Sequence, residues 1–351
     1  MEILIFQLIF IALWGGLVYK IMYKSPQKNA LFLSVAFFSM WYIHSMVNPD
    51  TFNDLPKYRE VFNSIGITQW GRISNHWAAV DMELGYLYMN KLVYKLTSSF
   101  SVFLWIYSFI MLILYFRTID KYSPYLVLSV LLVLLIPYNQ SLFVIRQHMA
   151  VAIYFASIPL ILERKLFSFL LVAILAFFIH RSSIIFIPVY FLYFFNGRRL
   201  VYVLLSFIVL FVVFWGSITV LSASFFDYGW FAQQAEGRTN ISTFIQVLMF
   251  FLLYVFALGK SVFNIGINKL IFCILFLSLF FNGISIGLNI GRMAIYYNVI
   301  SILSIPISLK YIKSTVVRSV ISVTIVLLLF VQMIYGSNSQ YYEKMELISF
   351  F

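Results

Sequence analysis

Charged residues and cysteine are scarce in this chain of 351 residues. Asp, Glu, Lys and Arg together make up 10% of the sequence, whereas they make up about 25% of an ordinary soluble domain. The one cysteine, Cys273, lies inside an apolar run, so the chain cannot form an internal disulfide or a thiolate metal site. These shortages exclude a soluble enzyme, a disordered tail and a secreted scaffold held by disulfides.

Apolar residues take the place of the missing charge. The sequence is 63% hydrophobic and 20% aromatic, and its mean hydropathy is +0.96. A membrane-spanning helix needs about 20 mostly apolar residues. We therefore expect an all-α polytopic membrane protein with a single transmembrane domain over residues 1–351 and about twelve spans, of which 166–180 and 183–196 are short enough to be one broken hairpin. The candidates lie near 2–22, 30–47, 100–119, 124–142, 147–163, 166–180, 183–196, 199–222, 242–259, 269–288, 292–310 and 316–336.

The positions of the basic residues predict the orientation of the chain. If the amino terminus lies outside, fourteen of the 24 basic residues fall in the inner connections, together with two of the 12 acidic residues. Lys and Arg concentrate in the cytoplasmic loops of membrane proteins. The net charge of +12 then needs no nucleic-acid partner. Residues 1–14 show no early basic region and no clear cleavage site, so we expect the first helix to be retained.

The two longest external connections are predicted at 48–99 and 223–241. In the longer one, Asp54 can cap a helix that has Pro56 in its first turn, and apolar side chains from Leu55 to Ile65 follow at helical spacing, with Gly66 able to end it. A second short helix is expected over 82–96, behind Asp81. Such helices would lie along the outer interface. Asp81 and Glu83 have a spacing that can hold a divalent cation, but two carboxylates are weak evidence, and we expect no metal site.

Single arginines stand at the predicted outer ends of spans, and they are the most informative feature of the sequence. The inner connections are short and contain no nucleotide-binding loop, so any chemistry is expected outside. Ionisable groups at membrane depth are costly and usually mark a ligand site or a pathway, and converging guanidinium groups suit phosphate. An arginine at a helix end is also commonly a snorkelling anchor. The four residues are Arg146, Arg181, Arg238 and Arg292.

Three residues are candidate proton-transfer groups. His180 precedes Arg181, and Glu83 and Asp54 lie in the long external loop. Each has a structural alternative, because a histidine can cap a buried hydrogen-bond network and loop carboxylates usually cap helices or face solvent.

The order of these motifs resembles that of a known family. Asp54 with Tyr58 is followed by Glu83-Leu84-Gly85-Tyr86, then Arg146-Gln147-His148, then His180-Arg181-Ser182-Ser183, and finally Asn289, Arg292 and Tyr296. This series is similar to the EpsG-like branch of the Wzy-type polysaccharide polymerases, over residues from about 50 to 300. Asp50 can replace Asp54 in the first motif.

The resemblance implies a bacterial inner-membrane glycosyltransferase with a GT-C-like helical fold. It would join repeat units carried on undecaprenyl pyrophosphate at the extracytoplasmic face, for O-antigen, capsule or exopolysaccharide, without a cofactor, with inversion and with a possible chain-length-regulating co-polymerase. His180, Glu83 and Asp54 would be catalytic. The four arginines, Arg146 and Arg292 first, would bind the pyrophosphate. Substrate contacts would come from Tyr58, Tyr86, Gln147, His148, Asn289 and Tyr296.

Three other functions remain open at this point. A flippase for lipid-linked oligosaccharides would have a similar number of spans and would need no base. A GT-C transferase that adds one sugar from a polyprenyl monophosphate is the closest rival. A membrane O-acyltransferase usually takes a cytoplasmic acyl donor, whereas all four histidines of this chain are predicted to lie on or near the outer side.

Overall fold

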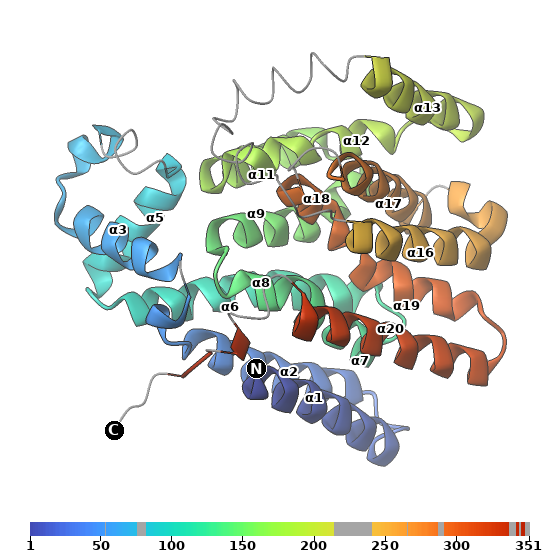
Figure 1. Cartoon of the computed structure of the whole chain (residues 1–351), viewed down its shortest axis with the longest axis horizontal. Helices are drawn as coiled ribbons and strands as arrows, with labels where there is room; N and C mark the ends of the chain where they lie inside the picture. Colours follow the sequence, from blue (N-terminus) through green and yellow to red (C-terminus); the bar gives the residue numbers. More distant parts are fainter. Residues whose placement is uncertain are drawn as a thin grey trace. The chain divides into compact units, whose positions relative to one another are not determined.

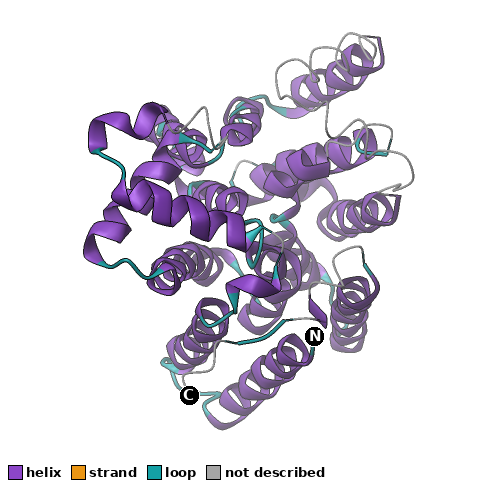
Figure 2. Ribbon diagram, turned by 60° about the vertical axis from the view of Figure 1, so that its left-hand side comes forward, coloured by secondary structure: helices purple, strands orange, loops and turns teal. Residues whose placement is uncertain are grey.

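The computed structural model describes residues 1–52, 54–75, 82–213, 241–264, 266–286, 291–336, 342–343 and 345–347. In this part of the chain the elements are helices joined by short loops (Figure 1), together with one isolated β-bridge between Val47 and Leu347. The same helices dominate when the molecule is turned (Figure 2). The prediction of an all-α polytopic membrane protein is confirmed.

Six of the described helices are long and apolar enough to cross a membrane. The bent pair α18 (Gly291–Asn298) and α19 (Ser301–Tyr311), with 47° between its halves, makes a seventh if it is one span. Each of the twelve predicted segments overlaps a helix, but the number of crossings stays a prediction. The six are α1 (Glu2–Ile21), α6 (Phe100–Tyr122), α9 with α10 (Ile145–Leu162), α16 with η5 (Ile241–Phe263), α17 (Ile267–Ile284) and α20 (Thr315–Tyr335).

Several apolar segments are divided into shorter helices, and proline explains two of the breaks. Pro137 lies within a π-helical turn, and Pro188 begins a new helix, because proline has no N–H for the helical hydrogen-bond ladder. These shorter elements are α7 (Leu126–Val133), η3 (Leu134–Tyr138), α8 (Asn139–Ser141), α11 (Leu166–Ile179), η4 (Arg181–Phe186), α12 (Pro188–Leu192) and α13 (Gly197–Val213).

The chain divides into two compact units. The first comprises Met1–Pro159, Phe167–Ile184 and Ile312–Phe351, and in it α6 packs between α2 (Lys28–Ser45) and α9. The second comprises Leu160–Leu166 and Ile185–Tyr311, and in it α17 packs against α16 and α18. The predicted second external loop, 223–241, lies outside the described residues except at its last position.

Both helices predicted in the 48–99 connection are present, as α3 (Leu55–Ile67) and α5 (Leu84–Leu96). The predicted apolar stripe of α3 is buried, with Phe62 and Ile65 fully inaccessible, and α3 packs on α5 in the first unit (Figure 1). Two details differ from the prediction. The Asp54 side chain makes no capping hydrogen bond, and Gly66 does not end the helix.

Lys91 explains why α3 continues past Gly66. The Lys91 side chain is buried, and its Nζ donates to the main-chain carbonyls of Gly66 and Thr68, at 2.6 Å in each case. A cation there satisfies carbonyls that a helix end leaves without partners. Gly66 itself lies against the Tyr94 ring, where an added Cβ would come within 2.4 Å of Cγ. The end of α3 is thus fixed by two residues of α5.

We expect Gly66→Ala to lower the free energy of unfolding by about 1–3 kcal/mol, the usual cost of overpacking. Thermal unfolding of the detergent-solubilised protein measures this effect. Gly16→Ala in α1 is the matched control, since an added Cβ there meets nothing within 4 Å and alanine favours a helix. Equal midpoints for Gly66→Ala and the parent would contradict the close packing of α3 on α5.

Candidate active site

The Glu83 carboxylate is the centre of a buried polar cluster in the first unit. Glu83 precedes the first turn of α5 and is 8% exposed. Its Oε2 accepts a hydrogen bond from the Arg146 guanidinium. Its Oε1 lies 2.9 Å from His180 Nδ1 and accepts a second hydrogen bond, of 2.9 Å, from the Arg181 main-chain N–H. The start of α5, the first turn of α9 and the residues after α11 therefore meet at one carboxylate.

Gly85 allows α5 to approach the end of α11 this closely. A Cβ at Gly85 would lie 2.6 Å from the Phe178 carbonyl oxygen and 2.7 Å from its Cβ. Main-chain atoms cannot move aside as the tip of a flexible side chain can. A glycine at this position therefore brings Glu83 within reach of His180, two residues beyond Phe178. The prediction did not give Gly85 a role, although it lies in the Glu83-Leu84-Gly85-Tyr86 motif.

Two tyrosines surround the Arg146 guanidinium. Its Cζ lies 5.7 Å from the centre of the Tyr58 ring and 5.8 Å from that of the Tyr86 ring, within the range of cation–π attraction. The two rings meet edge to face with their centroids 5.8 Å apart. Tyr58 comes from α3 and Tyr86 from α5, so the packing of these helices determines the surroundings of the cation.

Opposing effects act on the ionisation of Glu83. Burial alone would raise its pKa, but the hydrogen bond from His180, the Arg146 charge and the Arg181 N–H together lower the pKa of this carboxyl to about 2. Glu83 is therefore an anion at physiological pH. Because a carboxylate only accepts hydrogen bonds, His180 must carry a proton on Nδ1, and a neutral imidazole then has its lone pair on Nε2.

The contacts around Glu83 and the position of Asp54 bear on the catalytic roles predicted for these two residues. A carboxylate with a pKa of about 2 is a weak base at neutral pH, so Glu83 suits orientation of His180 better than proton abstraction. Asp54 is exposed and lies within electrostatic range of Tyr58. Asp50, the alternative to Asp54, forms an ion pair of 2.6 Å with Arg59.

The other predicted residues lie in different places. Gln147 and His148 are each 1% exposed, directly after Arg146 in α9, and His148 lies within electrostatic range of His180 and His44. Arg292 is exposed and Tyr296 is buried, both in α18 of the second unit. Arg238, Asn289 and Asp81 fall outside the described residues. The first unit thus brings Arg146 and Arg181 together at Glu83, and the convergence of all four arginines stays a prediction.

The part of the chain that the structure describes contains no group of three or more His, Cys, Asp or Glu residues that could hold a metal ion.

Comparison with known protein families agrees with the motif order. The sequence model of the EpsG family matches residues 31–349. This chain belongs to the EpsG family. The match includes every residue of the cluster around Glu83. Neither the curated proteins nor the solved structures gave a match. Membership in the EpsG family supports a Wzy-like polysaccharide polymerase of the glycosyltransferase type, a multi-pass membrane protein that acts on lipid-linked sugars.

We expect Glu83→Gln to lower the free energy of unfolding of this EpsG family protein by about 3–5 kcal/mol, because it leaves the Arg146 charge buried without its partner. The carboxylate is stabilised above the unfolded pKa, and that contribution is lost as the pH falls toward the folded pKa of about 2. Measured from pH 8 downward, the difference between parent and variant should therefore shrink below about pH 5, where the carboxyl of the unfolded parent takes up a proton.

Unfolding of both proteins across this pH range measures the effect. Glu163→Gln is the control, because its ion pair with Lys165 is exposed and should contribute about 0–1 kcal/mol. A small loss for Glu83→Gln, equal to that of the control, would contradict the buried pair.

Proposed function

We propose that this protein polymerises repeat units carried on undecaprenyl pyrophosphate at the extracytoplasmic face of the membrane. The observation that carries the proposal is the hydrogen bond between the buried Glu83 carboxylate and His180 Nδ1. A carboxylate in this position holds an imidazole in one tautomer and orientation and stabilises the imidazolium that forms when the ring takes a proton. Polymerisation of sugars needs a base of this kind for the acceptor hydroxyl.

In the proposed step, the acceptor hydroxyl oxygen attacks the anomeric carbon of the glycan on the donor lipid. The carbon–oxygen bond to pyrophosphate breaks, its electron pair leaves with the pyrophosphate, and the hydroxyl proton passes to His180 Nε2. One direct displacement inverts the anomeric configuration. The Glu83 carboxylate stabilises the imidazolium of His180 that results. The proton is then released to the external solution.

Cations assist departure of the pyrophosphate. The Arg146 guanidinium binds Glu83, and Arg181 follows His180 in the sequence and donates its main-chain N–H to the same carboxylate. A fixed positive charge stabilises a developing anion most strongly in a site from which water is largely excluded. The Arg146 side chain is 17% exposed. From the first unit we assign Arg146 and Arg181 to the leaving group, and the roles of Arg292 and Arg238 stay predictions from the sequence. The energy comes from the sugar–pyrophosphate bond, so the reaction needs no nucleotide.

We expect His180→Gln to lower the polymerisation rate by about 10²–10⁴-fold, the usual contribution of a general base. The measurement uses the full chain in liposomes with lipid-linked single repeats and follows product length on gels. The parent and Arg72→Gln, which changes an exposed arginine of the 48–99 connection, should both give a ladder of polymer lengths, while His180→Gln leaves single repeats.

Three outcomes would contradict the proposal. A normal ladder from folded His180→Gln protein would remove His180 as the base. Addition of one sugar without further growth would indicate the monophosphate-dependent transferase. Movement of lipid-linked repeats across sealed vesicles without any elongation would indicate the flippase.

A further inference from the structure

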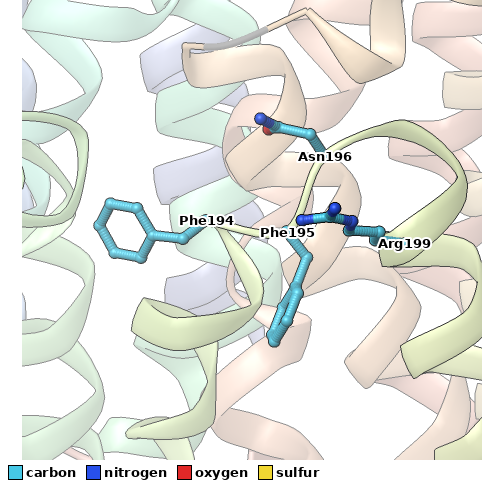
Figure 3. A pocket seen from close by; sticks show the side chains of 4 residues that line it. All are labelled: Phe194, Phe195, Asn196 and Arg199. Carbon is cyan, nitrogen blue, oxygen red and sulfur yellow. The ribbon is translucent and has the colours of Figure 1, made fainter.

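A second polar site lies in the other unit, on the side that the loop charges assign to the cytoplasm. It is a pocket of about 350 Å³ where α12 is followed by α13. Phe194, Phe195, Asn196 and Arg199 line it (Figure 3). In this view the Arg199 guanidinium extends toward the loop that carries Asn196 and Phe195. None of these four residues belongs to the cluster around Glu83.

The two polar side chains that line this pocket, Asn196 and Arg199, can both donate hydrogen bonds to a ligand. Lys269 in α17 is 2% exposed, and its Nζ donates to Asn196 Oδ1 at 2.9 Å. Because the ammonium occupies the amide oxygen, Asn196 has its NH₂ group to offer to another partner. The Arg199 guanidinium is a donor only. The Arg164 guanidinium lies 5.5 Å from the centre of the ring of Phe194, one of the lining residues. A site with these groups suits an anion with several acceptor oxygens.

The helix dipole disfavours two of these cations where they stand. Lys269 and Arg199 lie in the first turns of α17 and α13, and neither first turn contains an acidic residue. The helix dipole disfavours positive charge at this end and favours an anion. A topology signal requires basic residues in the loops but no buried ammonium group. Burial of Lys269 behind Asn196 therefore points to a use beyond orientation of the chain.

The aromatic walls distinguish a lipid from a free phosphate. Phe194 and Phe195 are 36% and 39% exposed, and they stand beside the donors on the same pocket. Inorganic phosphate or pyrophosphate would gain nothing from these rings, whereas a lipid places its apolar chains against them. Basic pockets between helices at the cytoplasmic surface commonly bind anionic lipid headgroups.

We propose that this pocket binds the phosphate headgroup of an anionic phospholipid of the cytoplasmic leaflet, held by Arg199 and the Asn196 amide, with Lys269 orienting that amide and the acyl chains lying along Phe194 and Phe195. The site is separate from the proposed polymerase reaction and does not depend on it.

Native mass spectrometry of the full chain tests this assignment. The detergent-solubilised protein is titrated with phosphatidylglycerol and, in parallel, with zwitterionic phosphatidylcholine. The parent should retain one phosphatidylglycerol in preference to phosphatidylcholine. Arg199→Gln should weaken this binding by about fivefold, as expected for one basic residue near an anionic lipid. Lys313→Gln is the matched control, because it removes the same charge from an exposed residue outside the pocket, and it should bind like the parent.

Asn196→Ala keeps the assignment testable if Arg199→Gln does not fold, since it removes the amide donor without changing the charge. It should also weaken phosphatidylglycerol binding. Equal binding by the parent and the folded pocket variants would overturn the proposal, as would equal loss in Lys313→Gln or equal affinity for phosphatidylcholine. A third titration uses inorganic pyrophosphate alone. Binding of pyrophosphate that depends on Arg199, with no phosphatidylglycerol retained, would overturn the lipid assignment.

Discussion

A buried carboxylate cannot remain charged in an apolar bundle unless its oxygens are satisfied, and this requirement organises the first unit. Glu83 meets it with the Arg146 guanidinium, His180 and the Arg181 main-chain N–H. Three segments that are distant in the sequence must therefore come together at one point. The same contacts that satisfy the anion fix the tautomer of His180 and hold the Arg146 guanidinium at the same carboxylate, and the proposed glycosyl transfer depends on this arrangement.

Packing at a few small residues makes this meeting possible. Gly85 lets α5 approach the Phe178 main chain, and Gly66 lets α3 lie against Tyr94. Lys91 then holds the end of α3 through two carbonyls. The pairing of α3 with α5 carries Tyr58 and Tyr86 to the guanidinium of Arg146. The long connection between the second and third predicted spans is thus a wall of the candidate site.

Much of the fold follows from periodicity and composition alone. The apolar segments, the two helices of the long connection and the buried stripe from Leu55 to Ile65 are local patterns. The pairing of Glu83 with Arg146 and His180 is not local, because 63 and 97 residues separate the partners. Sequence reasoning therefore named these residues but assigned Arg146 to the pyrophosphate alone. It missed the ion pair of Arg146 with Glu83. It also missed Lys91, which the sequence shows as a charged residue among the apolar positions of a short helix.

A double-mutant cycle tests the central interaction most directly. Unfolding free energies are compared for Glu83→Gln, Arg146→Gln and the variant that carries both changes. If the two side chains form a buried pair, the double variant loses less stability than the sum of the single losses, because neither charge is left alone. We predict a coupling of about 1–3 kcal/mol. Strictly additive losses would contradict the account, since they would mean that Glu83 and Arg146 do not interact in the folded protein.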